Sequence, residues 1–207
     1  MTPSPEGRPR AAERAPAVSL PAGGSAFRAR AGAVRLVILD VDGVLTDAGI
    51  YLGETASGDP VEFKRFDIQD GLGIRLLRDA GIRVALISGR VSAATELRAR
   101  ELGIEECHQD GGARKLPAAR ALKRRYDLAW HEVAMLADDL PDLPLFRLVG
   151  VPAAVANAVR EIRREAVWTG QRSGGRGAVR EFAEALLTAR GEWEAAVEAY
   201  CRARSGG

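Results

Sequence analysis

The stretch LVILDVDGVLTD, from residue 36 to residue 47, contains two carboxylates, Asp40 and Asp42, separated only by Val41. The four residues before Asp40 are all apolar, which is typical of a buried strand. Side chains alternate along a strand, so both carboxylates would face the same way while Val41 turns into the core. Neighbouring carboxylates repel, and each raises the pKa of the other, which helps one of them to keep a proton for acid catalysis. We therefore expect the chain to supply further groups that offset this repulsion.

Further polar residues follow the later predicted strands. Ser88 follows the apolar run GIRVALI, and Asp138 follows the run HEVAMLA. The carboxyl ends of parallel strands lie along one edge of a sheet, which is where ligands bind. The candidates that we place at this edge are Ser88, Gly89, Arg90, Lys115, Asp138, Asp139 and Asp142. Each residue type also has an ordinary use: serine and glycine in turns, lysine at an exposed helix start, and aspartate as a helix cap.

Strand patterns alternate with helical patterns from residue 34 onward. Predicted strands cover residues 34–40, 81–90, 103–108, 131–139, 149–156 and 167–169. Predicted helices cover residues 70–81, 92–103, 115–127, 140–150, 157–166, 177–191 and 192–205. This alternation predicts an α/β fold with a doubly wound, Rossmann-like parallel sheet. The polar, Gly-containing residues 49–66 indicate a β-hairpin.

The composition is that of an ordinary globular protein, with 207 residues, a formal net charge of +2 and 46% hydrophobic residues. We expect one main domain over residues 31–190 and a C-terminal helix or tail over residues 191–207. Residues 1–30 are rich in Pro, Ala, Gly and Arg, so we expect a disordered extension there. The slight positive charge gives no reason to expect nucleic-acid binding, and no apolar run is long enough to span a membrane. Two cysteines without a CxxC pair favour a cytoplasmic protein.

Four segments resemble the motifs of the haloacid dehalogenase (HAD) superfamily of phosphotransferases, in the order in which that superfamily has them. These segments are DVDGVLTD, LISGR, Lys115 and ADDLPD. The resemblance implies that Asp40 is the nucleophile, which forms an aspartyl phosphate, and that Asp42 is the general acid and base. It also implies a Mg²⁺ ion held by Asp40, by the main-chain carbonyl of Asp42 and by Asp138.

The same resemblance implies supporting roles for the other motif residues. Ser88 and the amide after it would donate to phosphate oxygens. Lys115 would add positive charge where the transition state spreads negative charge. Asp139 or Asp142 would orient bound water or Lys115.

Two more segments are similar to the capless 3-deoxy-D-manno-octulosonate 8-phosphate phosphatases, a family within that superfamily. They are ExKxFxxxDGxGI, which begins at Glu62, and GGRGAVRE near the C-terminus. The segments on either side of Ser88 are too short for an inserted cap domain, as in this family. The resemblance implies a homotetramer whose hairpins pack together and whose C-terminal segments reach neighbouring sites. Contacts with the sugar-acid phosphate would come from Lys64, Asp70, Gly89, Arg90, Arg176 and Arg180.

One departure from the family pattern bears on the substrate: Gln69 stands where an arginine is common before the Asp-Gly pair. A related nine-carbon 2-keto-3-deoxy sugar-acid phosphate therefore stays open as the substrate. A phosphomutase would need a cap to retain its intermediate, and none is predicted. A non-catalytic assembly or regulatory module is the remaining alternative, although such a relic typically lacks Asp40, Asp42 or Asp138.

Overall fold

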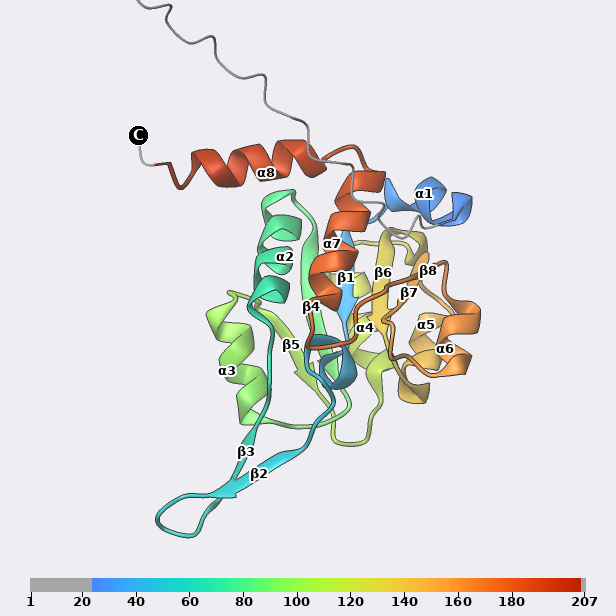
Figure 1. Ribbon diagram of the computed structural model, residues 1–207. Coiled ribbons are helices and arrows are strands. Elements are labelled where there is room, and N and C mark those ends of the chain that lie inside the picture. The colour runs from blue at the N-terminus through green and yellow to red at the C-terminus, as the bar shows by residue number, and fades with distance from the viewer. Residues whose placement is uncertain (1–23, 206–207) are drawn as a thin grey trace, which may run out of the picture.

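The computed structural model describes residues 24–205, and a six-stranded sheet forms the centre of the fold (Figure 1). The strand order is β5-β4-β1-β6-β7-β8, and every neighbouring pair is parallel. These strands are β1 (Leu36–Leu39), β4 (Arg83–Ser88), β5 (Glu106–Gln109), β6 (Val133–Ala137), β7 (Val151–Ala154) and β8 (Trp168–Thr169). An antiparallel hairpin consists of β2 (Tyr51–Glu54) and β3 (Pro60–Phe63). The α/β fold, the parallel sheet and the hairpin are therefore confirmed.

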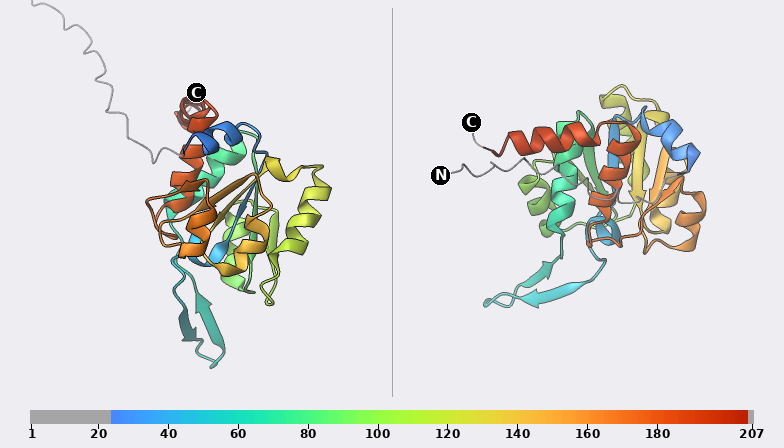
Figure 2. Two further views of the ribbon diagram at one scale, coloured as in Figure 1. Left: turned by 90° about the vertical axis from the view of Figure 1, so that its right-hand side faces the viewer. Right: turned by 45° about the horizontal axis from the view of Figure 1, so that its top comes forward.

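Helices alternate with the strands. They are α1 (Ser25–Ala31), α2 (Ile68–Asp79), α3 (Ala93–Glu101), α4 (Lys115–Arg125), α5 (Leu143–Phe146), α6 (Arg160–Glu165), α7 (Ala178–Ala189) and α8 (Trp193–Arg202). Short helical turns are η1 (Val41–Leu45), η2 (Trp130–Glu132) and η3 (Leu140–Asp142). Helices α2 and α7 pack together and, with α1, cover one face of the sheet, while α4 and α5 lie on the other (Figures 1 and 2). Helices on both faces make this a doubly wound sheet.

The central strands are apolar on both faces because both faces are covered. In β1, every residue from Leu36 to Leu39 is at most 1% exposed. Strand β6 is buried along its whole length as well. The core accordingly runs through the sheet and holds the ends of these two strands in fixed positions.

The strand order creates a switch point beside β1. The chain runs from β1 outward through β4 to β5, and then crosses back to β6 on the other side of β1. Leu39 and Leu136 are neighbours in the β1–β6 register, so the residues that follow these two strands emerge side by side. Ligands bind at such switch points, beyond the carboxyl ends of the strands.

Helix α1 corrects one expectation about the N-terminus. Residues 1–23 lie outside the described part of the chain, but Ser25–Ala31 is a helix, so the expected disorder is wrong for residues 24–30. A helix of seven residues is too short to be stable alone, and composition gives no sign of it. Packing stabilises it, because the Phe27 ring lies in the core against Trp168 and Phe182.

The hairpin stands at the carboxyl edge of the sheet and α8 lies at the opposite end of the molecule (Figure 1). Between β1 and β4 the chain adds only η1, the hairpin and α2, and between β4 and α4 it adds only α3 and β5. Within residues 24–205 there is therefore no cap domain, as the sequence predicted. No helix in this described range is both long enough and apolar enough to cross a membrane.

Candidate active site

A tight turn follows β1, where the sequence suggested that the strand would continue. Strand β1 ends at Leu39, and the turn η1 closes with the Thr46 hydroxyl donating to the Val41 carbonyl at 3.2 Å. Gly43 has a φ of +96°, a left-handed conformation that favours glycine. Asp42 lies in this turn, so the expectation that Asp40 and Asp42 share the side-chain alternation of one strand is wrong, although Val41 is buried as expected.

Three carboxylates gather where β1 and β6 end. Oxygen atoms of Asp40, Asp138 and Asp142 all lie within 4.8 Å of one another. Asp40 and Asp142 are buried, and Asp138 is partly buried. A Cβ atom at Gly43 would lie 2.0 Å from Asp138 Oδ2, so only glycine lets the turn approach this carboxylate. The switch point of the sheet therefore carries a compact acidic cluster.

Lys115, the first residue of α4, bridges two of these acids. Its Nζ donates to Asp40 Oδ1 and to Asp142 Oδ1, each at 2.5 Å. Burial alone lowers the pKa of Lys115, but the two carboxylates outweigh it and raise this pKa above its ordinary value. Asp142 Oδ2 also accepts from the main-chain N–H of Asp138 at 3.4 Å. Lys115 therefore stays charged and holds Asp40 in a defined orientation.

In the described part of the chain the cluster is short of positive charge, since one ammonium, that of Lys115, pairs with acids of a group of three carboxylates. Asp138 Oδ1 is buried and has no hydrogen-bond partner among residues 24–205. Burial, followed by the charge of Asp40, raises the pKa of Asp138 to about 9. Burial likewise raises the pKa of Asp142 to about 6, in spite of Lys115. A divalent cation would satisfy the free acceptor and offset the repulsion, and carboxylate oxygens are the ligands that Mg²⁺ prefers. The residues present fit a Mg²⁺ ion.

The two adjacent acids after β6 have different surroundings. Asp139 is exposed, and its Oδ1 accepts from the Leu140 N–H at 2.7 Å. It is thus the N-cap of η3, which is the common use of aspartate at such a position. Asp138 instead lies with Asp40 and Asp142.

Strand β4 delivers Ser88 beside Asp42. Ser88 is buried, and its Oγ donates to Asp42 Oδ2 at 3.4 Å and accepts from the Arg90 N–H at 3.1 Å. At Gly89, a Cβ atom would lie 3.1 Å from the Cβ of Ala113, two positions before Lys115. The absence of a side chain at Gly89 therefore lets the loop after β4 approach the loop that directly precedes α4 and Lys115.

The hairpin brings Lys64 to Asp42 as well. Lys64 Nζ donates to Asp42 Oδ1 at 2.6 Å, and the Arg90 guanidinium lies 3.5 Å from the same oxygen. Arg90 also donates to Glu62 in β3 at 2.5 Å. The structure thus gathers these two predicted substrate contacts, Lys64 and Arg90, around Asp42.

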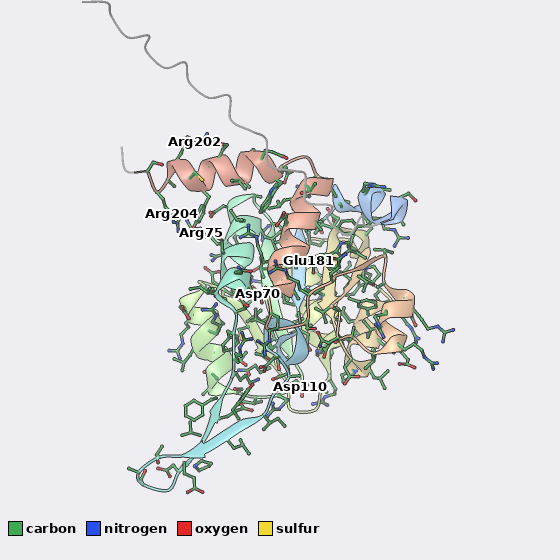
Figure 3. The ribbon with its side chains drawn as sticks, viewed as in Figure 1. Asp70, Arg75, Asp110, Glu181, Arg202 and Arg204 are labelled. Carbon is green, nitrogen blue, oxygen red and sulfur yellow. The ribbon has the colours of Figure 1, made fainter. Side chains whose placement is uncertain are left out.

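Asp70 and Arg180 are engaged elsewhere, at α7. The Asp70 carboxylate is buried and accepts from the main-chain N–H groups of Gly177 at 3.3 Å and Arg180 at 2.8 Å (Figure 3). Asp70 therefore caps the start of α7 from α2, and burial raises its pKa to about 6. The Arg180 guanidinium lies 5.1 Å from the centre of the Trp193 ring and 3.8 Å from Glu184. Neither side chain joins the acidic cluster.

Arg176 is exposed in the loop before α7, near the base of the hairpin. Burial raises the pKa of Asp47, but hydrogen bonds from Tyr51 and Gly49 outweigh it and lower this pKa, and the charge of Arg176 makes a smaller contribution in the same direction. Asp47 in turn accepts from the Tyr51 hydroxyl at 2.8 Å. Arg176 therefore lies at the rim, close to the residues that connect η1 with β2.

Sequence reasoning missed Asn157, which joins two loops of the site. Its Nδ2 donates to the Gly43 carbonyl at 3.1 Å, and its Oδ1 accepts from the Gly174 N–H at 2.7 Å. The Gly-rich loop 173–177 is thereby bound to the turn after β1. Asn157 directly follows the predicted strand at residues 149–156, so the rule that located the other candidates at strand ends would also have found it.

No protein-family model matches this chain. The chain is 41% identical to the 3-deoxy-D-manno-octulosonate 8-phosphate phosphatase KdsC of Escherichia coli strain K12 over 168 residues, which are 81% of this chain and 87% of the relative.

Two solved structures share the fold. A HAD superfamily (subfamily III A) hydrolase from Legionella pneumophila has a TM-score of 0.79 and 39% identity, and the match covers 87% of this chain and 96% of that one. The Moraxella catarrhalis 3-deoxy-D-manno-octulosonate 8-phosphate phosphatase, in complex with a magnesium ion, a phosphate ion and KDO, has a TM-score of 0.77 and 36% identity over 84% of this chain and 97% of that one. The resemblance found in the motifs is confirmed, and the chain belongs to the 3-deoxy-D-manno-octulosonate 8-phosphate phosphatase family of the HAD superfamily.

Proposed function

We propose that this protein is a Mg²⁺-dependent phosphatase that hydrolyses 3-deoxy-D-manno-octulosonate 8-phosphate. The observation that carries the proposal is the grouping of Asp40, Asp138 and Asp142 with Lys115 at the switch point of the sheet. The names of the relatives support it, because E. coli KdsC is named for this activity. The magnesium, phosphate and KDO in the Moraxella structure support the metal and the substrate class.

Asp40 is the nucleophile in this proposal. One carboxylate oxygen forms a bond to phosphorus, while the bond between phosphorus and the sugar oxygen breaks and leaves its electrons on that oxygen. Asp42 gives the departing oxygen a proton and later takes a proton from the water that hydrolyses the aspartyl phosphate. The two contacts of Lys115 hold Asp40 and Asp142 in place, and Ser88 lies where it can donate to a phosphate oxygen.

Asp40, Asp138 and the main-chain carbonyl of Asp42 would hold the Mg²⁺ ion. When bound, the ion supplies positive charge that stabilises the phosphoryl group in the transition state. The free acceptor of Asp138 suits this role, because the atom has no other partner among the described residues. Asp142 supports the site indirectly by holding Lys115 and the first turn after β6.

Basic groups at the rim support an acidic substrate. Gln69 replaces the arginine that is common before Asp70, but Arg172 donates to Gln69 Oε1 at 2.8 Å. A guanidinium therefore still lies next to this position, from a different segment. Arg176 is a second exposed arginine in the same loop.

The experiment is Mg²⁺-dependent release of phosphate by the purified protein. The eight-carbon 8-phosphate, a nine-carbon 2-keto-3-deoxy sugar-acid 9-phosphate and simple sugar phosphates are compared by kcat/KM. We expect the eight-carbon substrate to have the highest kcat/KM. Asp40→Asn should lower kcat by at least about 1000-fold. Asp127→Asn, an exposed acid just past the end of α4 that lies opposite to Lys115, is the matched control. Full activity in Asp40→Asn, or no phosphate release from any substrate, would contradict the proposal.

We also propose that the chain assembles as a homo-oligomer, a tetramer by family resemblance, through its hairpin. Ile50, Leu52 and Phe63 are 65%, 76% and 60% exposed in the single chain. Large apolar side chains that gather on a projecting element are typical of contact surfaces between proteins. Light scattering at micromolar concentration should give a mass above that of one chain, and a monomer would exclude this assembly.

A further inference from the structure

The hairpin carries two charged side chains into the site. Glu62 and Lys64 are two positions apart, so in extended chain they point to the same side. Glu62 accepts from Arg90, and Lys64 donates to Asp42 Oδ1. Two charged residues of the site are therefore held by the hairpin and not by the sheet.

Asp42 has few other anchors. It stands in η1 with φ −79° and ψ 108°, so no regular helix fixes its backbone. Ser88 Oγ lies 3.4 Å from Oδ2 and Arg90 lies 3.5 Å from Oδ1, which are long contacts. Within residues 24–205, the 2.6 Å bond from Lys64 is the one short contact of this carboxylate side chain.

The two carboxylate oxygens of Asp42 consequently differ. Lys64 and Arg90 both approach Oδ1, whereas Oδ2 faces the Ser88 hydroxyl. Only 1% of the Lys64 side chain is exposed, against 21% for Asp42. The ammonium is therefore enclosed with its partner, and little of it is open to a substrate.

We propose that Lys64 is a positioning residue that acts through Asp42, an inference that rests on the proposed phosphatase function. The Lys64 ammonium donates a hydrogen bond to Oδ1, both when Asp42 is charged and when Oδ2 carries the proton for the departing oxygen. In that step the O–H bond of Asp42 breaks, an O–H bond forms on the leaving oxygen, and the electrons of the broken P–O bond stay on that oxygen. The hairpin thereby sets the orientation of the general acid.

The test compares two leaving groups. Nitrophenolate departs readily without a proton, whereas phenolate needs one, so a misplaced general acid affects phenyl phosphate much more than 4-nitrophenyl phosphate. For Lys64→Met we expect kcat on phenyl phosphate to fall at least about 10-fold further than kcat on 4-nitrophenyl phosphate, with KM nearly unchanged. Lys64→Arg should recover most of this loss because it keeps the cation.

Asp42→Asn should likewise lower kcat on phenyl phosphate more than kcat on 4-nitrophenyl phosphate. In the double variant with Lys64→Met, the ratio of the two kcat values should stay as it is in Asp42→Asn. Glu54→Gln, an exposed acid in β2, is the control and should behave as wild type. Thermal unfolding checks that each variant is folded, and Lys64→Gln replaces Lys64→Met if the latter does not fold.

Equal losses on both substrates, or a loss confined to KM, would overturn the positioning role and make Lys64 a direct substrate contact. Hydrolysis of neither substrate by the wild-type protein would instead be a failure of the proposed function. The wild-type measurement therefore separates the two ideas.

Discussion

At the scale of single residues, Gly43 controls how closely the turn after β1 approaches Asp138. Its φ is +96°, and an added Cβ would lie 2.0 Å from Asp138 Oδ2. For Gly43→Ala we expect a displaced carboxylate and a fall in kcat of about 100-fold, the usual cost of a small misplacement in an active site. The measurement is phosphate release at saturating substrate and Mg²⁺.

Gly58 offers a matched control for this substitution. It also has a left-handed φ, of +85°, but nothing lies within 4 Å of an added Cβ. Gly58→Ala should therefore cost about 1 kcal/mol in the free energy of unfolding from backbone strain and leave kcat unchanged. Similar losses of kcat in both variants would show that close approach to Asp138 is not the cause.

The environment of Asp138 indicates how Mg²⁺ should affect the thermal stability of the fold. The partly buried Asp138 has a pKa raised to about 9, and its Oδ1 has no hydrogen-bond partner among residues 24–205, so a bound cation should displace the proton and stabilise the charged carboxylate. Mg²⁺ at about 100 times its dissociation constant should stabilise the fold by about 2.7 kcal/mol, seen as a higher Tm. Chelation should reverse this change.

Asp138→Asn should lose most of the Mg²⁺-dependent rise in Tm. Its Tm without metal should equal or exceed that of wild type, because the fold raises the pKa of Asp138 to about 9, so the carboxylate must take up a proton on folding at neutral pH and the amide need not. Asp127→Asn should keep the full response to Mg²⁺. An unchanged metal response in Asp138→Asn would exclude Asp138 as a ligand.

At the scale of elements, Asp70 connects α2 with α7, and its titration should be visible in the stability. The folded pKa is about 6, above the ordinary 3.8, because burial disfavours the charge. The stabilisation is therefore complete below about pH 4 and is lost as the pH rises through 6. Between pH 7 and pH 5 we expect the free energy of unfolding to rise by about 1 kcal/mol from this group.

Asp70→Asn should lack this increment and should be less stable overall, because an amide cannot replace both charged acceptors of the α7 N–H groups. Chemical denaturation at each pH gives the free energy of unfolding of wild type and of Asp70→Asn. Groups such as Asp142 titrate in both proteins, so their contribution cancels when the two free energies are subtracted. Asp59→Asn, at an exposed acid between β2 and β3, is the control. Equal pH dependence in Asp70→Asn and wild type would contradict this account.

At the scale of the whole molecule, the hairpin links assembly to chemistry. The exposed Leu52 and Phe63 side chains are the proposed contacts with other subunits, and Lys64 lies directly after Phe63. In the proposed oligomer both side chains are buried between subunits. Replacing them should weaken association by at least about 3 kcal/mol, or about 100-fold in Kd. Light scattering of Leu52→Ser/Phe63→Ser should therefore show dissociation towards the monomer.

Leu148→Ser is the control for this double variant. Leu148 is 39% exposed but lies after α5, away from the hairpin in the chain. Its substitution should leave the mass unchanged. An oligomer that survives the hairpin substitutions would place the contact on another surface.

Much of the fold and the identity of the acidic cluster could be predicted from local patterns. Apolar runs that end in Asp40, Ser88 and Asp138 mark three strands, and parallel strands share one carboxyl edge. The alternation of strands and helices was sufficient for the doubly wound sheet. The alternation of strands and helices therefore predicts that the residues at these strand ends meet at one edge of the sheet.

Other features depended on contacts between distant segments. The seven-residue α1 is stable only because Phe27 packs in the core. Asp138 and Asp139 are adjacent in sequence, yet one joins the cluster and the other caps η3, since the turn after β6 points them in different directions. The family resemblance implies a substrate contact at Asp70, whereas its carboxylate accepts from N–H groups at the start of α7, a contact that depends on α7 lying beside α2.

The sequence by itself determined which acids stand at strand ends, because strand periodicity and strand–helix alternation are local properties. The tertiary structure alone decided their partners: Lys115 for Asp40, Lys64 for Asp42, and no hydrogen bond for Asp138 Oδ1 within residues 24–205. The physical reason is that an ion pair needs its atoms within a few ångströms. Strand order, crossovers and the hairpin's position set that distance, and none of them is encoded by a single segment.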